Sequence, residues 1–224
     1  PAAPAPGHGM TLLQYFSQAD GVGRAVGLML LVMSVSSWVL ILWKTWLLRR
    51  AAVGITQAVA AFWRASGVDS ALAQVQAFDT EGMVLPMIAA ARETAPPQTL
   101  GSQPAHAAQL TRQLRGTLQV GLERLQHGQI VLATVGSTAP FVGLLGTVWG
   151  IYHALLTIAG AGHISIDKLA GPVGESLIMT AAGLAVAIPA VLAYNVHGRI
   201  IVRLEALLEG FAHDLREWRL EGGA

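Results

Sequence analysis

The sequence predicts an all-α membrane protein in which three helices cross the bilayer and two of them extend into a cytoplasmic helical bundle. Hydrophobic residues make up 53% of the 224 residues and charged residues only 12%, whereas a soluble domain carries about a quarter charged residues. The apolar residues are gathered into three runs without formal charge, each long enough for the roughly 20 residues that a spanning helix needs. A net charge of +1 gives no reason to propose a nucleic-acid partner.

Charged residues bound the three runs. The first run lies between Arg24 and Lys44, and the second lies between Arg124 and Asp167. We expect the third to begin at Pro172, because proline is favoured at the first position of a helix. The predicted transmembrane helices are residues 22–48, 129–159 and 172–196.

Basic residues predict how the chain is oriented. Arginines are concentrated between the first two spans and after the third, and the positive-inside rule places that side in the cytoplasm. The N-terminus is then periplasmic and the C-terminus cytoplasmic, and the proline-rich start of the chain looks processed or truncated. The segments outside the spans are a flexible periplasmic tail (1–21), a cytoplasmic helical region (49–128), a short periplasmic loop (160–171) and a cytoplasmic C-terminal helix (197–224).

Two apolar stripes at helical spacing flank the later spans. The first stripe predicts a helix that runs unbroken into the second span. The second is a heptad-like seam, which packs either against helices of the same chain or against another subunit. The stripes are Leu110, Leu114, Leu118, Leu122 and Leu125, and Ile201, Leu204, Leu208, Phe211, Leu215 and Trp218.

One face of the second span is almost bare backbone. Its residues lie within about 40° of one line at 100° per residue, and Gly146 with Gly150 adds a small-x-x-x-small pair beside it. Tight helix packing explains the pattern, with Gly143 and, on the third span, Gly183 among the packing residues. The alternative has Thr147 presenting its hydroxyl to a polar pore, and the two readings are compatible in an oligomer. The face is formed by Gly136, Pro140, Gly143, Thr147, Gly150 and Ala154.

The third span brings further polar groups into the membrane. Glu175 is the only acidic residue within the three predicted spans, and an ionised carboxylate there needs protein or water as a neighbour. It also lies about one turn inside the predicted helix start, from where it could reach the outer interface. Thr180 lies about 140° from Glu175, so both can border one cavity only if much of the helix does.

Motifs of common enzyme classes are absent from the sequence. It contains no phosphate-binding G-x-x-x-x-G-K-[ST] loop, no H-E-x-x-H zinc motif and no G-x-S-x-G nucleophile elbow. It has no cysteine, and its histidines, His153 among them, are not at metal-ligand spacing. The sequence therefore predicts no enzyme activity, no cofactor and no metal site.

Two of the spans carry motifs that resemble a known family. Residues 139–151 (APFVGLLGTVWGI) resemble the second-span signature of the ExbB/TolQ/MotA proton-channel family. Residues 171–184 (GPVGESLIMTAAGL) and 187–191 (AIPAV), followed by Tyr194-Asn195, resemble its third-span signature. These stretches cover roughly a third of the chain, and the three-span topology is similar over the rest.

The resemblance implies a partnership and a set of roles. It implies a homopentamer whose second and third spans surround a pore occupied by single-span ExbD-like helices, which bring a membrane aspartate that this chain lacks. Thr147, Glu175 and Thr180 would border the proton path. The complex would sit in the bacterial inner membrane and drive a TonB-like protein, energising outer-membrane import of iron-siderophores, haem or vitamins.

Within that family the sequence is more similar to the ExbB branch. The residues 171–175 and the extended outer tail favour it over the TolQ branch, which energises the Tol-Pal envelope system. MotA has a larger cytoplasmic insertion without counterpart here. A non-conducting membrane scaffold, in which Glu175 pairs only structurally, is a different class and predicts normal function after Glu175 is neutralised.

Overall fold

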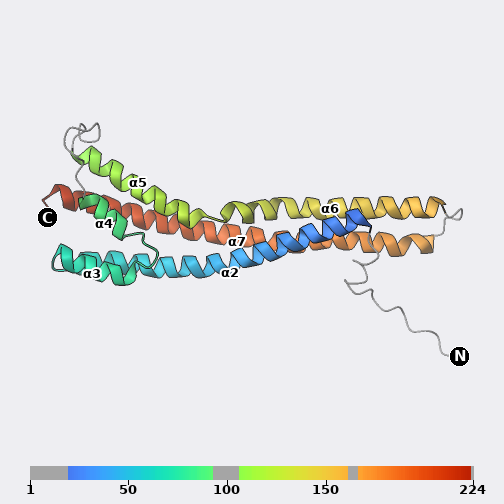
Figure 1. Cartoon of the computed structure of the whole chain (residues 1–224), viewed down its shortest axis with the longest axis horizontal. Coiled ribbons are helices and arrows are strands. Elements are labelled where there is room, and N and C mark those ends of the chain that lie inside the picture. Colours follow the sequence, from blue (N-terminus) through green and yellow to red (C-terminus); the bar gives the residue numbers. More distant parts are fainter. Residues whose placement is uncertain (1–19, 93–105, 161–165, 223–224) are drawn as a thin grey trace, which may run out of the picture. The chain divides into compact units, whose positions relative to one another are not determined.

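The computed structural model describes residues 20–92, 106–160 and 166–222. Within these ranges the chain consists of α-helices joined by short turns, which confirms the predicted all-α class. Three of the helices, α2, α6 and α7, are long and apolar enough to cross a membrane. The helices are α2 (Gly21–Arg64), α3 (Val68–Phe78), α4 (Leu85–Arg92), α5 (His106–Gln126), α6 (Gln129–Gly160) and α7 (Ile166–Leu220), as labelled in Figure 1.

The chain divides into two compact units. Among the described residues, the first comprises 20–40, 130–160 and 166–193, and the second comprises 41–92, 106–129 and 194–222. Helices α2 and α7 each continue from the first unit into the second without a break. Two membrane-length helices do extend beyond the first unit, but they are α2 and α7, whereas the apolar stripes predicted the extension for the second and third spans.

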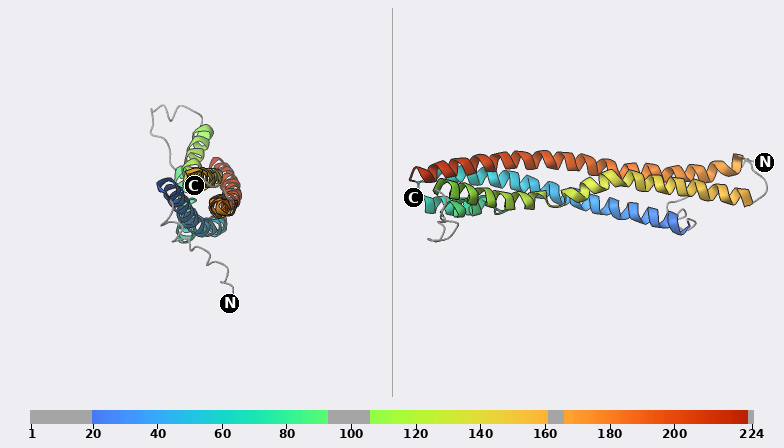
Figure 2. Two further views of the ribbon diagram at one scale, coloured as in Figure 1. Left: turned by 90° about the vertical axis from the view of Figure 1, so that its right-hand side faces the viewer. Right: turned by 90° about the horizontal axis from the view of Figure 1, so that it is seen from above.

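The first unit contains the start of α2, nearly all of α6 and the first half of α7. Helices α6 and α7 run side by side in both views of the chain (Figures 1 and 2). Large apolar side chains cover the outside of this unit, as Val32 at 60%, Phe141 at 70% and Leu192 at 61% exposure illustrate. Such a surface is stable in hydrocarbon, because lipid tails are as apolar as the side chains themselves.

The predicted continuous helix from residue 110 into the second span is wrong. Helix α5 ends at Gln126 and α6 begins at Gln129, and Gly128 between them has a φ of 80°. Residues other than glycine rarely adopt this left-handed conformation, which ends a helix by turning its backbone out of the hydrogen-bond ladder. The leucine stripe hides the break, because it continues in register up to Leu125.

Helix α7 begins earlier than the sequence predicts. It starts at Ile166, six residues before the expected Pro172, so that Pro172 and Pro189 both lie inside the helix. A proline inside a helix lacks an N–H and leaves a carbonyl one turn back without its usual partner. The carbonyl oxygen of Pro172 itself accepts a hydrogen bond from the Ser176 hydroxyl at 2.8 Å.

The second unit is a small helical bundle with its own core. Both predicted apolar stripes are buried in it, apart from Trp218, which is half-buried against the same core. The ring of Phe62 in α2 stacks edge-on against Phe211 of α7 at 5.5 Å between centroids and against Trp218 at 5.8 Å. Of the two open readings of the α7 seam, packing within the same chain is therefore the one the structure shows.

The loop between α3 and α4 is held by one buried carboxylate. Helix α3 folds back beside the end of α2 (Figures 1 and 2), and Asp79 follows it. Its two carboxylate oxygens accept hydrogen bonds from the backbone N–H groups of Met83, Val84 and Leu85 at 2.7 to 2.9 Å. These donors lie at the start of α4, where a helix has N–H groups without partners and where a negative charge is favourable.

Candidate functional site

The candidate site lies where α6 and α7 pack closely in the first unit. Gly143 of α6 and Gly183 of α7 face each other with almost no space between the backbones. A Cβ placed on Gly143 would lie 2.5 Å from the carbonyl oxygen of Met179, and one on Gly183 would lie 2.6 Å from that of Ala139. Real Cβ atoms do not approach oxygens so closely, so only glycine permits this helix separation.

The other two predicted packing glycines also lie at helix contacts. A Cβ on Gly146 would lie 2.9 Å from a methyl group of Val26 in α2 and 3.1 Å from Met179. A Cβ on Gly150 would collide with the hydroxyl of Ser176. Gly143 and Gly150 thus lie where α6 meets α7, and Gly146 lies where α6 meets both α2 and α7.

This close approach brings the predicted hydroxyl groups together. Thr147 Oγ1 forms a hydrogen bond with Thr180 Oγ1, and it lies 3.2 Å from the carbonyl oxygen of Gly143 and 3.1 Å from that of Ser176. Thr147 is 6% exposed. The hydroxyl therefore has protein acceptors on its own helix and on the neighbouring one.

The hydroxyl proton of Thr147 has more than one possible acceptor. A threonine hydroxyl can donate only once, yet Thr147 has two carbonyl acceptors within reach and can also accept from Thr180. Donors with alternative acceptors can reorient, which is the step that a hydroxyl contributes to a proton relay. The Thr147 hydroxyl can thus switch its hydrogen bond from a carbonyl of α6 to one of α7, and both threonines stay uncharged as it does so.

Glu175 belongs to α7, one residue before Ser176. Its side chain lies outside the part of the chain that the structure describes. The assignment of Thr147, Glu175 and Thr180 to a proton path stays a prediction, and the geometry adds the direct Thr147–Thr180 contact to it.

A second polar cluster ties the start of α2 to the far end of α6. Asp20 accepts a hydrogen bond from the backbone N–H of Gly23 at 2.9 Å and another from the indole Nε1 of Trp149. His153 Nδ1 lies 3.8 Å from the same carboxylate. The bond from Trp149, followed by that from Gly23, lowers the pKa of Asp20 below its ordinary value of 3.8. The carboxylate therefore stays ionised at any pH above that value.

A third polar group is buried in the second unit. Lys44 of α2 is fully buried, and its Nζ donates to the carbonyl oxygens of Leu125, at 2.8 Å, and His127. Next to it, Thr45 Oγ1 lies 2.9 Å from Nε2 of His197. The ammonium group thereby caps the carbonyl end of α5, where a cation is favourable.

Sequence reasoning missed these last two clusters. His153 has no carboxylate at helical spacing because its partner, Asp20, is the residue that precedes α2. Lys44 marks the end of a charge-free run, and its carbonyl partners lie more than 80 residues away. Only the break at Gly128, had it been recognised, would have indicated that helix-end carbonyls needed a donor.

Comparison with known proteins agrees with this fold. A family profile described as the MotA/TolQ/ExbB proton channel family matches residues 73–210. This range includes the whole of α6 and the part of α7 that carries Thr180. It covers more than half of the chain.

Individual relatives match over most of their length. A biopolymer transport protein ExbB from Xanthomonas campestris is 40% identical over 212 residues, which are 90% of this chain and 83% of the relative. A biopolymer transport protein ExbB from Neisseria meningitidis is 38% identical over 210 residues, 92% of this chain and 96% of the relative. A Tol-Pal system protein TolQ from Pseudomonas aeruginosa is 34% identical over 201 residues, 86% of this chain and 84% of the relative.

The matched family is one of transport proteins rather than of enzymes. The structure has three membrane-length helices, a glycine-lined contact between α6 and α7, and a buried pair of hydroxyl groups. The sequence is also 40% identical to a relative over 90% of this chain. This chain is a multi-pass membrane protein that belongs to the MotA/TolQ/ExbB proton channel family.

Proposed function

We propose that the chain is the channel subunit of a motor complex in the bacterial inner membrane that couples the proton-motive force to TonB-dependent import across the outer membrane. The imported cargo would be iron-siderophores, haem or vitamins. The relatives named biopolymer transport protein ExbB support this branch, because they match over nearly the whole chain. The observation that carries the proposal is the buried hydroxyl contact between Thr147 and Thr180.

The proposed topology follows the distribution of arginines. The spans are residues 22–48, 129–159 and 172–196, with the N-terminus in the periplasm and the C-terminus in the cytoplasm. The second unit, with its helical bundle, then lies on the cytoplasmic side. The tail (1–21) and the loop 160–171 would be periplasmic, while 49–128 and 197–224 would be cytoplasmic.

The proposed mechanism uses a partner that supplies the charge. Copies of this chain form a homopentamer, and an ExbD-like single-span helix inside the pore carries an aspartate. Protonation removes the charge of that aspartate and lets its helix move, while Thr147, Glu175 and Thr180 stabilise successive states. One proton moving down about 100 mV provides roughly 2.3 kcal/mol, so several protons can drive a conformational step of a TonB-like protein.

The Thr147→Val variant tests the hydroxyl. Valine keeps the shape of threonine but cannot form a hydrogen bond with Thr180, so we expect the complex to assemble. Transport should fall by about a hundredfold or more, since a group that transfers protons contributes roughly 10²–10⁴-fold. Growth with a siderophore as the only iron source measures the effect in a strain that lacks its own channel subunit. Thr134→Val is the matched control, because Thr134 is exposed on the same helix and its hydroxyl donates to the carbonyl oxygen of Ile130 at 2.8 Å, within the same helix. Full growth of the assembled Thr147→Val protein would contradict the assignment.

Glu175→Gln separates a channel from a scaffold. Glutamine keeps the size of the side chain and one acceptor oxygen but cannot take up or release a proton. A channel subunit should lose proton-driven transport, whereas a non-conducting scaffold should keep it. Copurification of an aspartate-bearing single-span partner with the variant shows whether assembly is intact. Normal transport by an assembled Glu175→Gln complex would favour the scaffold.

A TolQ-like subunit of the Tol-Pal envelope system is the second candidate. The TolQ relative from Pseudomonas aeruginosa supports this candidate, because it is 34% identical over 86% of this chain. The two candidates predict different rescues. A subunit of the TonB-dependent type restores siderophore-dependent growth, and a TolQ-like subunit restores resistance of the envelope to detergent.

A further inference from the structure

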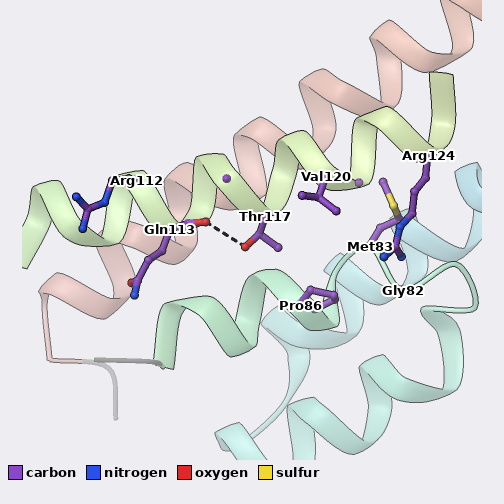
Figure 3. A pocket seen from close by; sticks show the side chains of 10 residues that line it. Gly82, Met83, Pro86, Arg112, Gln113, Thr117, Val120 and Arg124 are labelled. Atoms are coloured by element: carbon purple, nitrogen blue, oxygen red, sulfur yellow. Dashed lines mark hydrogen bonds between the residues drawn. The ribbon is translucent and has the colours of Figure 1, made fainter. Parts of the chain in front are cut away.

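The second unit has an open groove along one side of α5. A hollow of about 520 Å³ lies between this helix and the loop before α4, with Met83 and Pro86 opposite Thr117 and Val120 (Figure 3). An adjoining hollow of about 470 Å³ continues along the same helix. Val120 is 52% exposed, and the position of a Cβ on Gly116 meets no atom within 4 Å. The helix therefore presents a bare, half-apolar face to its surroundings.

The rim of this groove is basic. Arg112 lines both hollows, Arg124 lines the first and Arg115 the second, and all three side chains are exposed. Glu123 is the one acidic residue of α5. The groove therefore fits an acidic partner.

The end of α7 has a surface of the opposite sign. Its two arginines in this stretch turn inward: Arg216 Nε donates to Thr111 Oγ1 at 2.9 Å, and Arg219 Nε donates to the carbonyl oxygen of Ala91 at 3.2 Å. The acidic side chains of the same stretch are exposed, so the outward face of α7 is negative. They are Glu209, Asp214, Glu217 and Glu221.

We propose that the α5 groove of one copy binds the outward face of the α7 end of a second copy. This inference rests on the homo-oligomer of the proposed function and deepens it by naming the two surfaces that meet. Both surfaces belong to the same chain and do not overlap, so the contact is head-to-tail and can close into a ring. The charges at its rim fix which parts meet rather than supplying most of the affinity.

The membrane fixes the register of this contact. Helices α5 and α7 run in opposite directions, and the bond between Arg216 and Thr111 shows which of their residues lie at the same height. All copies in a ring around the membrane normal keep their residues at equal heights. Arg115 then lies within about 3 Å of the height of Asp214 in the neighbouring copy, since a helix rises 1.5 Å per residue.

Single-cysteine variants test the contact, because the chain has no cysteine of its own. Two differently tagged copies are produced together in membranes, one carrying Arg115→Cys and the other Asp214→Cys. Oxidation should give a reducible heterodimer containing both tags, at about five times or more the yield of a control pair, since a disulfide needs Cβ atoms roughly 4 Å apart. The control pair replaces Arg115→Cys by Arg49→Cys, which is exposed on α2.

The outcomes separate this inference from the function it rests on. If native mass measurement shows an oligomer but Arg115→Cys and Asp214→Cys cross-link no better than the control pair, the inference is wrong and the channel proposal stands. Cross-linking of Arg115→Cys to a coexpressed single-span partner instead of a second copy would also overturn it. A monomer in the native mass measurement would refute both the inference and the channel proposal.

A charge swap gives a second check of the contact. Arg115→Glu should lower the oligomeric fraction at least about twofold, and adding Asp214→Arg should restore it.

Discussion

Replacing Gly143 with alanine is expected to loosen the contact between α6 and α7 and to destabilise the protein. The new Cβ would lie 2.5 Å from the carbonyl oxygen of Met179 and 3.2 Å from the Cα of Thr180, and backbone atoms cannot rotate away as a side chain would. Overpacking of this kind costs about 1 to 3 kcal/mol, more than the roughly 1 kcal/mol that alanine gains over glycine within a helix. The melting temperature in detergent, followed by circular dichroism, should fall by several degrees.

The same change should impair transport as well as stability. If α6 and α7 move apart, Thr147 can no longer reach both Thr180 and the carbonyl oxygen of Ser176. Gly198→Ala is the matched control, since Gly198 lies inside α7 with no atom within 4 Å of its Cβ position. It should leave stability unchanged or raise it. Equal melting temperatures for Gly143→Ala and Gly198→Ala would show that the close approach does not contribute to the fold.

The Lys44→Met variant is expected to destabilise the second unit by about 1 to 3 kcal/mol. Methionine retains the apolar stem but removes the ammonium group, so the carbonyl oxygens of Leu125 and His127 lose their donor. Leaving a buried acceptor unsatisfied costs about 1 to 3 kcal/mol, and relief from burying a charge offsets part of that loss. Denaturant unfolding of the purified protein measures the net change.

Limited proteolysis locates the effect of the Lys44 change. The turn at Gly128 should be cleaved faster in Lys44→Met than in the parent, because the cap that holds the end of α5 is missing. Arg49→Met is the control: Arg49 is an exposed long cation on the same helix, five residues on. A Lys44→Met protein as stable as Arg49→Met would mean that water replaces the ammonium group without cost.

Much of the fold could be predicted from the sequence because membrane helices are set by local composition. Runs without charge are a sufficient signal for a spanning helix, and both apolar stripes are buried as their spacing predicts. The break between α5 and α6 could not be predicted in this way. Glycine is tolerated inside helices, and nothing in the local pattern shows that Gly128 takes a positive φ.

The candidate site was predictable only in part. The pattern of small residues places Gly143 and Thr147 on one face of a helix, and this follows from the periodicity of that helix alone. That Thr147 meets Thr180 depends on how two helices are rotated against each other, and this is decided by contacts such as Gly143 against Gly183. The partners of Lys44 are likewise set by tertiary packing, so residue type and position alone could not identify them.

The turn at Gly128 also has a mechanical consequence. Helices α2 and α7 each run on as one helix, so their own backbone hydrogen bonds resist a twist applied at one end, although Pro172 and Pro189 each remove one such bond from α7. Helix α6 has no such continuity with α5, because the ladder is interrupted between them. The backbone of α6 can therefore turn about its own helix axis without twisting that of α5.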